Sequence, residues 1–318
     1  MEWYWWCLVA LGGILLLFLA ITLYCYIRVF HVKKPRPLKE GEYDTPPGRA
    51  YEPYREMMVE WIKSIRALPH EDVEIVSFDG LTLRGRYYEC EKGAPMEIQF
   101  HGYQGYSERD LCGGVERCFR LGRNVLMVDH RGCGRSDGHF GSFGIRERLD
   151  CLNWVDFAVK KFGPDVKIMI TGVSMGAATV VMASAAPPLP PQVVGVLADC
   201  GYSSAKKIIK KVVGEMHLPP DLVYPFIKLG ARIWGGFDLE ETSPVEAAAN
   251  AKVPIIFVHG DTDDFVPYEM SVEMYEACTQ GKRLITVKGA GHGLAYPADR
   301  DGYVEQLRVA CEELHLFS

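Results

Sequence analysis

Residues 166–183 read VKIMITGVSMGAATVVMA and contain a Gly-x-Ser-x-Gly pentapeptide, Gly172 to Gly176. An apolar run of strand length precedes the pentapeptide, and a run of helix length rich in small residues follows it. Glycines on both sides of Ser174 permit a sharp bend, because a Cβ there would strike neighbouring backbone. The pattern predicts a serine hydroxyl held above a parallel sheet, at a helix N-terminus whose free N–H groups can stabilise an oxyanion.

Two later strand exits carry the residue types that complete a triad in the order Ser, acid, His. The apolar run 254–258 is followed by a loop with several carboxylates. The short run 283–287 is followed by His292, which has a glycine on either side. Because the carboxyl ends of parallel strands share one edge of a sheet, we expect both loops to meet Ser174 there. The candidate carboxylates are Asp261, Asp263 and Asp264.

From about residue 70 to residue 315 the chain resembles the α/β-hydrolase superfamily. Within it the sequence is similar to bacterial single-domain hydrolases related to the prolyl-oligopeptidase and dienelactone-hydrolase-like groups, many with an N-terminal membrane anchor. The resemblance implies an α/β fold of the α/β-hydrolase type, with a mostly parallel central sheet, helices on both faces and a short helical cap. Besides the serine pentapeptide, the matching segments are His101-Gly102-Tyr103, the turn 129–138, the segment 259–267 and Gly291-His292-Gly293.

The resemblance also implies the catalytic roles. Ser174 is expected to be the nucleophile, His292 the proton carrier, and Asp263 the acid that orients the imidazole. Asp263 is preferred because it occupies the family's His-Gly-x-x-Asp position, and Asp199, after the preceding strand, is the alternative. The alternative nucleophiles are Ser136 and Ser203.

Two backbone N–H groups, those of Tyr103 and Met175, are expected to form the oxyanion hole. His101-Gly102 has a single glycine, unlike the HGGG pattern of lipase-like esterases. The Tyr103 hydroxyl is therefore a second candidate to point into the pocket.

The N-terminus predicts a transmembrane helix. Trp3 to Ile27 is an uncharged run of 25 residues, long enough at about 1.5 Å per residue to cross roughly 30 Å of hydrocarbon. Only Glu2 precedes the run, whereas a cleaved signal peptide would begin with a basic region. Under the positive-inside rule the basic residues after the run predict a single-pass cell-membrane protein with a cytoplasmic catalytic domain. These residues are Arg28, Lys33, Lys34, Arg36 and Lys39.

The expected organisation is a membrane anchor at 1–30, a linker and amphipathic helix at 31–68, and a hydrolase domain at 69–318. Within the last, the segment at about 203–241 interrupts the alternation of strands and helices and is expected to form the cap. Asp79-Gly80 predicts a hairpin between strands at 73–78 and 81–88. Removal of residues 1–30 is expected to leave a soluble, active domain.

Composition and charge restrict the classes of function that are expected. The net charge of −6 gives no sign of nucleic-acid binding, and the ten cysteines show no metal-ligand spacing. No cofactor and no metal are expected, and the expected partners are a small-molecule ester and a membrane. The leading hypothesis is a serine hydrolase that cleaves carboxylic esters of small to medium acyl groups through an acyl-enzyme. The alternatives are a prolyl-oligopeptidase-like (S9-like) peptidase or amidase, and a non-catalytic hydrolase fold that serves as a binding module.

Overall fold

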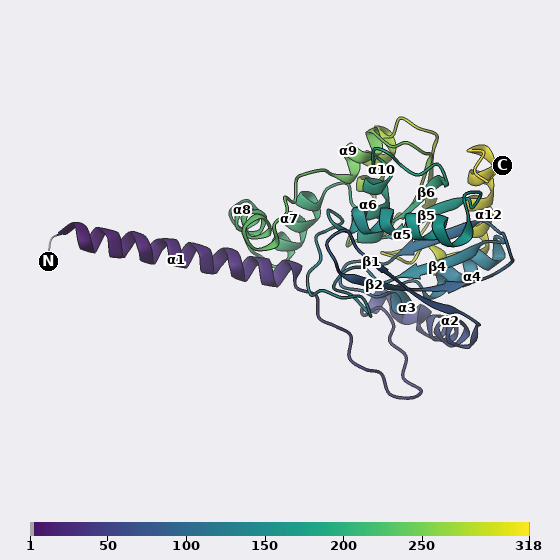
Figure 1. Ribbon diagram of the computed structural model, residues 1–318, viewed down its shortest axis with the longest axis horizontal. Helices are drawn as coiled ribbons and strands as arrows, with labels where there is room; N and C mark the ends of the chain where they lie inside the picture. Colours follow the sequence, from purple (N-terminus) through teal and green to yellow (C-terminus); the bar gives the residue numbers. More distant parts are fainter. Residues whose placement is uncertain (1–2, 318) are drawn as a thin grey trace.

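Eight strands form one central sheet in the order β1-β2-β4-β3-β5-β6-β7-β8 in the computed structural model, which describes residues 3–317 (Figure 1). The first two strands form the hairpin predicted around Asp79-Gly80, and β2 also pairs antiparallel with β4. The remaining pairs are parallel, which confirms the predicted sheet. The strands are β1 (Glu71–Val76), β2 (Thr82–Tyr88), β3 (Met96–Phe100), β4 (Asn124–Val128), β5 (Ile168–Val173), β6 (Val193–Asp199), β7 (Ile255–Gly260) and β8 (Lys282–Val287).

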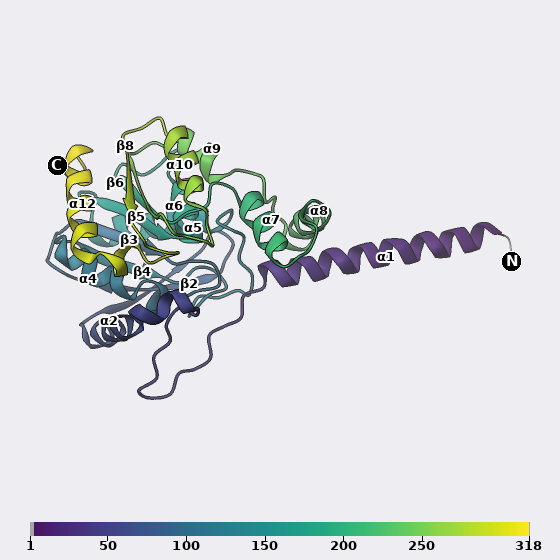
Figure 2. The same ribbon diagram turned by 180° about the vertical axis from the view of Figure 1, so that it is seen from behind.

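Helices cover both faces of this sheet, as Figures 1 and 2 show. Strands β3, β4 and β7 are buried along their whole length, as expected for a sheet covered on both sides. One face carries α5 (Glu147–Phe162), α6 (Met175–Ala183), α9 (Pro244–Ala249) and α10 (Tyr268–Ala277). The other carries η1 (Arg49–Tyr54), α2 (Arg55–Ala67), α4 (Cys112–Arg120) and α12 (Arg300–Glu313), and two short helices, α3 (Ser107–Asp110) and α11 (Ala295–Ala298), lie in loops.

The predicted amphipathic helix is α2, and it packs on the body. It buries Met58, Trp61, Ile62 and Ile65, which recur at helical spacing and so share one face. Burial of such side chains is worth about 1.5–3 kcal/mol each, so the helix is held by its apolar stripe.

The cap consists of three consecutive helical segments between β6 and α9. They are α7 (Ala205–Glu215), α8 (Pro220–Gly230) and the π-helical turn η2 (Ala231–Gly235). They fall inside the segment 203–241 that the sequence predicts. In both ribbon views α8 lies beside the N-terminal helix, at the end of the body toward that helix (Figures 1 and 2).

The N-terminal helix α1 (Trp3–Phe30) projects from the body as a rod and is long and apolar enough to cross a membrane (Figure 1). Its last turns, however, belong to the packed body. Thr22, Tyr26 and Phe30 are buried, and Phe30 is 0% exposed between other aromatic rings. The packing therefore does not divide at residue 30, because the helix enters the body near Thr22.

The contact between α1 and the cap is close and specific. The indole N–H of Trp234 donates a hydrogen bond of 3.1 Å to the Thr22 hydroxyl. A Cβ at Gly230 would lie 2.6 Å from the Thr22 carbonyl oxygen, so glycine is required where the helices meet. Beyond α1 the backbone N–H of Val32 donates to the His139 carbonyl at 2.7 Å, so the start of the expected linker is also attached to the body.

Candidate active site

Ser174 stands on a strained turn between β5 and α6. Its φ of 58° and ψ of −116° lie where side-chain-bearing residues are rare. A Cβ at Gly172 would lie 2.1 Å from the backbone of Gly176, and a Cβ at Gly176 would lie 2.1 Å from the Phe100 carbonyl oxygen. The two flanking glycines are thus required by close backbone approach, as the pentapeptide predicts.

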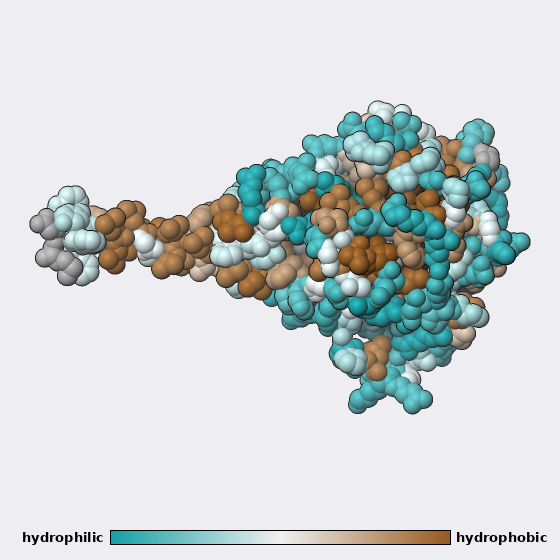
Figure 3. Space-filling view, viewed as in Figure 1, coloured by the Kyte–Doolittle hydropathy of each residue, from teal (hydrophilic) through white to brown (hydrophobic). Residues whose placement is uncertain are grey.

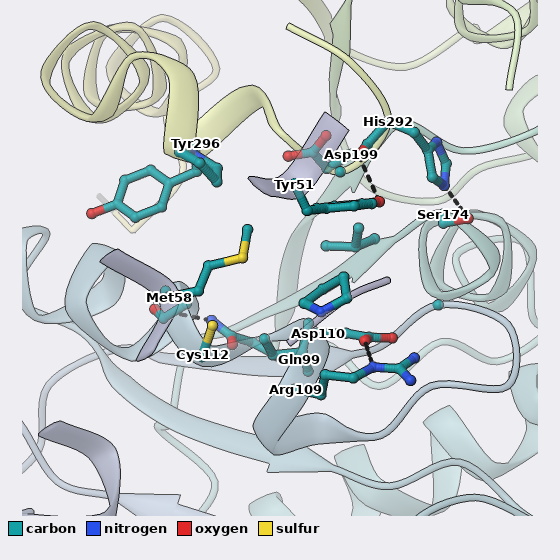
Figure 4. A pocket seen from close by; sticks show the side chains of 18 of the residues that line it. Tyr51, Met58, Gln99, Arg109, Asp110, Cys112, Ser174, Asp199, His292 and Tyr296 are labelled. Carbon is teal, nitrogen blue, oxygen red and sulfur yellow. Dashed lines mark hydrogen bonds and ion pairs between the residues drawn. The ribbon is translucent and has the colours of Figure 1, made fainter. Parts of the chain in front are cut away.

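A chain of short hydrogen bonds joins the three residues predicted as the triad. The Nε2 atom of His292 lies 2.9 Å from Ser174 Oγ, and its Nδ1 atom lies 2.7 Å from Asp263 Oδ2 (Figure 4 shows the serine contact). With a carboxylate at Nδ1, the neutral ring carries its hydrogen there and presents Nε2 as an acceptor to the serine hydroxyl. This is the tautomer that can take a proton from Ser174.

Asp263 is held as an anion by its surroundings. Burial opposes its ionisation, but hydrogen bonds from His259 and His292 hold its pKa well below the usual value. Its other oxygen, Oδ1, accepts from the backbone N–H groups of Phe265 at 3.0 Å and Val266 at 2.8 Å. The loop after β7 therefore fixes both the charge and the orientation of this carboxylate.

The alternative residues lie elsewhere. Asp199 is buried, which raises its pKa, and its Oδ2 atom accepts from the Tyr303 hydroxyl at 3.0 Å rather than from a histidine. Asp261 accepts from the backbone N–H of Gly289 at 2.6 Å. The side chain of Asp264, the third carboxylate of the β7 loop, has no hydrogen bond to His292 within residues 3–317.

The alternative nucleophiles are also separated from the histidine. The Ser136 hydroxyl donates to the Asp129 carbonyl at 2.7 Å and accepts from the Arg84 N–H at 2.8 Å, so it braces a turn. In the described part of the chain, Ser203 makes no hydrogen bond to a histidine.

The expected oxyanion donors flank Ser174. Met175 is the first residue of α6, where backbone N–H groups lack intrahelical partners. The loop after β3 passes close to the serine, since a Cβ at Gly102 would lie 3.5 Å from Ser174 Cβ. Within residues 3–317 the backbone N–H of Tyr103 donates no hydrogen bond to another backbone group. Both N–H groups are thus free to serve a ligand at Ser174.

The Tyr103 hydroxyl does not serve the pocket. It donates to the carbonyl oxygen of Val29 in α1, and the side chain of the next residue, Gln104, donates to the His31 carbonyl at 3.0 Å. The loop after β3 is thereby attached to the end of the N-terminal helix and to the residue that follows it. Burial raises the pKa of Tyr103 to about 12, so the phenol stays a neutral donor.

His101 is structural. Its Nε2 atom accepts from the backbone N–H of His130 at 3.0 Å, and the two rings pack edge to face. Burial lowers the pKa of His101 to about 4 and that of His130 to about 3, so both are neutral near pH 7. The histidine of the His-Gly motif therefore shapes the loop and takes no part in proton transfer at Ser174.

Two cavities meet at Ser174. The wider one, of about 520 Å³, runs from Ser174 and His292 past Tyr51 toward Met58 and Tyr296 (Figure 4). Its wall includes several polar side chains, among them Gln99, Arg109, Asp110, Asp199 and Tyr303.

The narrower cavity, of about 260 Å³, lies on the other side of Ser174. Side chains of α1, α7 and α8 enclose it, and most of them are apolar. Residues from α1 form part of the wall, namely Tyr24, Cys25, Arg28 and Val29.

The structure shows three contributions to the site that the sequence motifs did not predict. The Tyr51 hydroxyl donates to the His292 carbonyl at 2.9 Å and so holds the histidine loop from outside the hydrolase motifs. His259 bonds Asp263 Oδ2 at 3.1 Å and Ser271 Oγ at 2.6 Å, and its place in the His-Gly-x-x-Asp segment was the available signal for this role. The part of the cavity wall that α1 supplies could not be recognised in the sequence, because an apolar helix has the same composition in lipid and in a protein core.

Cys200, Asp263 and His292 also lie close enough to hold a metal ion. Both ring nitrogens of His292 are already engaged, by Asp263 and by Ser174. A metal ligand would have to give up one of these bonds, so the hydrogen-bonded chain accounts for the cluster without an ion.

Comparison with known proteins finds two family models that match adjoining segments of the chain. Residues 98–218 match the family model of serine aminopeptidase, S33, and residues 226–310 match that of the prolyl oligopeptidase family. The protein YqkD of Bacillus subtilis (strain 168) is 28% identical over 184 residues, which are 58% of this chain and 60% of that protein. The match therefore spans less than two thirds of that relative.

Solved structures show the same fold. The esterase Pf2001 of Pyrococcus furiosus superposes with a TM-score of 0.65 at 20% identity, over 89% of this chain and 99% of that one. The acylaminoacyl peptidase of Pyrococcus horikoshii superposes with a TM-score of 0.56 at 17% identity, over 80% of this chain and 44% of that one.

The chain therefore has the fold of the α/β-hydrolases. Its two matched segments are similar to the serine aminopeptidase (S33) and prolyl oligopeptidase (S9) families.

Proposed function

We propose that the protein is a serine hydrolase that cleaves carboxylic esters of small to medium acyl groups. The observation that supports this most is the chain of contacts from Asp263 through His292 to Ser174, at 2.7 and 2.9 Å. These distances are those of a base poised to activate a nucleophile and of an acid that orients the base.

The chemistry follows from the geometry. Ser174 Oγ attacks the ester carbonyl carbon while His292 Nε2 takes the serine proton, and the anionic Asp263 stabilises the resulting imidazolium. The backbone N–H groups of Tyr103 and Met175 bind the oxyanion of the tetrahedral intermediate. His292 then gives its proton to the leaving alkoxide, which departs as an alcohol. Water attacks the acyl-enzyme by the same route, releasing the acid and restoring Ser174.

The two cavities suggest how an ester would lie. The narrow cavity suits the acyl group, because apolar surface gains about 0.8 kcal/mol for each methylene that it buries and the walls from α1, α7 and α8 are mainly apolar. The wide cavity suits the leaving alcohol. Within residues 3–317, two buried acceptors on its wall, Gln99 Oε1 and Asp199 Oδ1, have no hydrogen-bond partner and can take hydroxyl donors.

The second candidate function is that of an S9-like peptidase or amidase. The matches to serine aminopeptidase and prolyl oligopeptidase favour it. An amide has a poorer leaving group than an ester, so its cleavage depends more strongly on proton delivery by His292.

A substrate panel separates the two functions. We expect the highest kcat/KM on p-nitrophenyl esters of about two to eight acyl carbons, on the scale of a small apolar pocket, and much slower turnover of aminoacyl and prolyl p-nitroanilides. Ser174→Ala should abolish both this turnover and fluorophosphonate labelling, whereas Ser203→Ala should retain labelling. An anilide turned over faster than every ester would instead establish the peptidase.

We also propose that α1 is retained as a single-pass membrane anchor. The burial of Thr22 and Tyr26 argues against a signal sequence, since cleavage after the apolar run would remove both of these packed residues. The basic residues between Arg28 and Lys39 favour a cytoplasmic body. Digestion of the body by protease added outside sealed cells would reverse this orientation.

A further inference from the structure

The length of the exposed part of α1 fixes how deep the body must sit at a membrane. The exposed segment from Trp3 to Leu17 extends about 22 Å at about 1.5 Å per residue. A hydrocarbon layer is about 30 Å thick, so it needs about twenty helical residues. With Trp3 at the far interface, the layer therefore reaches at least Thr22, where α1 already packs against the cap.

The part of the cap that packs beside α1 at this depth presents apolar side chains. The ring of Phe226 in α8 lies 5.7 Å from that of Phe18 in α1, measured between centroids. Leu222 in the same helix is 64% exposed, and Ile233 and Trp234 in the adjoining turn are about 40% exposed. Figure 3 shows apolar surface along the projecting part of α1 that continues to its junction with the body.

The lysines of α7 do not add free positive charge to this surface. Three of the α7 lysines pair with carboxylates outside α7, and the fourth pairs with a glutamate one turn further along the same helix. The pairs are Lys206–Glu240, Lys207–Glu273, Lys210–Asp221 and Lys211–Glu215. Apolar side chains, rather than free cations, are what the cap offers next to α1.

The narrow cavity opens at this same level. Its rim includes Tyr24 of α1 together with Met216 and Leu218 from the turn between α7 and α8, and all three are exposed. Tyr24 is only two residues beyond Thr22, so the rim lies at the edge of the hydrocarbon layer. Ser174, which is buried, also lines this cavity.

We propose that the substrate is a membrane amphiphile, an ester with one fatty acyl chain, which enters the narrow cavity directly from the bilayer. The inference rests on the proposed ester hydrolysis and names its substrate class. The part of the chain next to the carbonyl fills the cavity up to Ser174, while the remainder stays in lipid along Tyr24, Met216 and Leu218. A long chain is then accepted although the cavity itself is small, because the bilayer continues the apolar path.

The test uses the full chain reconstituted in phosphatidylcholine vesicles. Hydrolysis of 1-monooleoylglycerol in the vesicles is compared with hydrolysis of water-soluble p-nitrophenyl butyrate. Leu222→Glu and Ile233→Glu place charge on the membrane side of the cap without touching the cavity wall. The matched control is Val76→Glu, at a 70% exposed position on β1.

We expect each cap variant to hydrolyse monooleoylglycerol at least about tenfold more slowly, because charge is excluded from the hydrocarbon edge, while p-nitrophenyl butyrate turnover changes less than about twofold. The control should change neither rate. Failure of the wild type to cleave monooleoylglycerol, or equal effects on both substrates, would overturn membrane entry. Failure to cleave p-nitrophenyl butyrate as well would instead reject the proposed esterase function.

Discussion

The loops around Ser174 and the seam between α1 and the cap serve the same site by different physical means. The loops are made by residues close together at strand ends, where glycines and short hydrogen bonds fix the geometry. The seam joins residues more than two hundred positions apart, such as Thr22 and Trp234, through apolar packing and one side-chain hydrogen bond. Disturbing the loops should change chemistry at a constant fold, whereas disturbing the seam should change the fold and access to the site.

The largest effect is expected in the loops. Asp263→Asn should lower kcat by about 10³-fold or more, because an amide cannot both hold the Nδ1–H tautomer of His292 and stabilise its imidazolium. Asp199→Asn should cost less than about tenfold, since its carboxylate bonds Tyr303 and not His292. Steady-state kinetics on a p-nitrophenyl ester measure both. The opposite ranking would transfer the role of the acid to the loop after β6.

The next effect belongs to the seam. Phe30→Ala should lower the free energy of unfolding by about 3–5 kcal/mol, the usual loss for a fully buried phenylalanine. Removal of residues 1–30 takes away Tyr26 and Phe30 together and should leave a destabilised, weakly active body, in contrast to the expectation from the sequence. Removal of residues 1–17, of which residues 3–17 are described and exposed, should preserve activity on soluble esters. Thermal unfolding of the two truncated proteins tests whether α1 is only an anchor. Equal stability of the two would contradict a stabilising role for the buried end of α1.

The smallest effect is expected where the two regions join. Tyr103→Phe removes the hydrogen bond to Val29 and retains the backbone N–H that we propose binds the oxyanion, so kcat should fall by no more than about tenfold. A direct oxyanion donor would be worth about 10²- to 10³-fold. Kinetics of this variant therefore report which part of Tyr103 acts, and a loss on the larger scale would mean that the hydroxyl turns toward the substrate.

The sequence was sufficient for the features that local sterics and order along the chain control. The glycines beside Ser174, the hairpin at Asp79-Gly80 and the alternation that gives a parallel sheet each follow from backbone constraints within a few residues. The convergence of strand exits at one sheet edge pointed to His292 and to the carboxylates of the loop after β7. The choice of Asp263 among those carboxylates came from the resemblance to the family's His-Gly-x-x-Asp segment.

Only the tertiary structure decided what distant segments contribute. Tyr51 reaches the His292 loop from η1, and the Tyr103 hydroxyl bonds Val29 of α1 instead of entering the pocket. The sequence could not divide α1 into an exposed part and a buried part, because lipid and a protein core select the same apolar residues. Where such a helix leaves one apolar environment for the other depends on which cap side chains meet it, and that is settled only when the chain is folded.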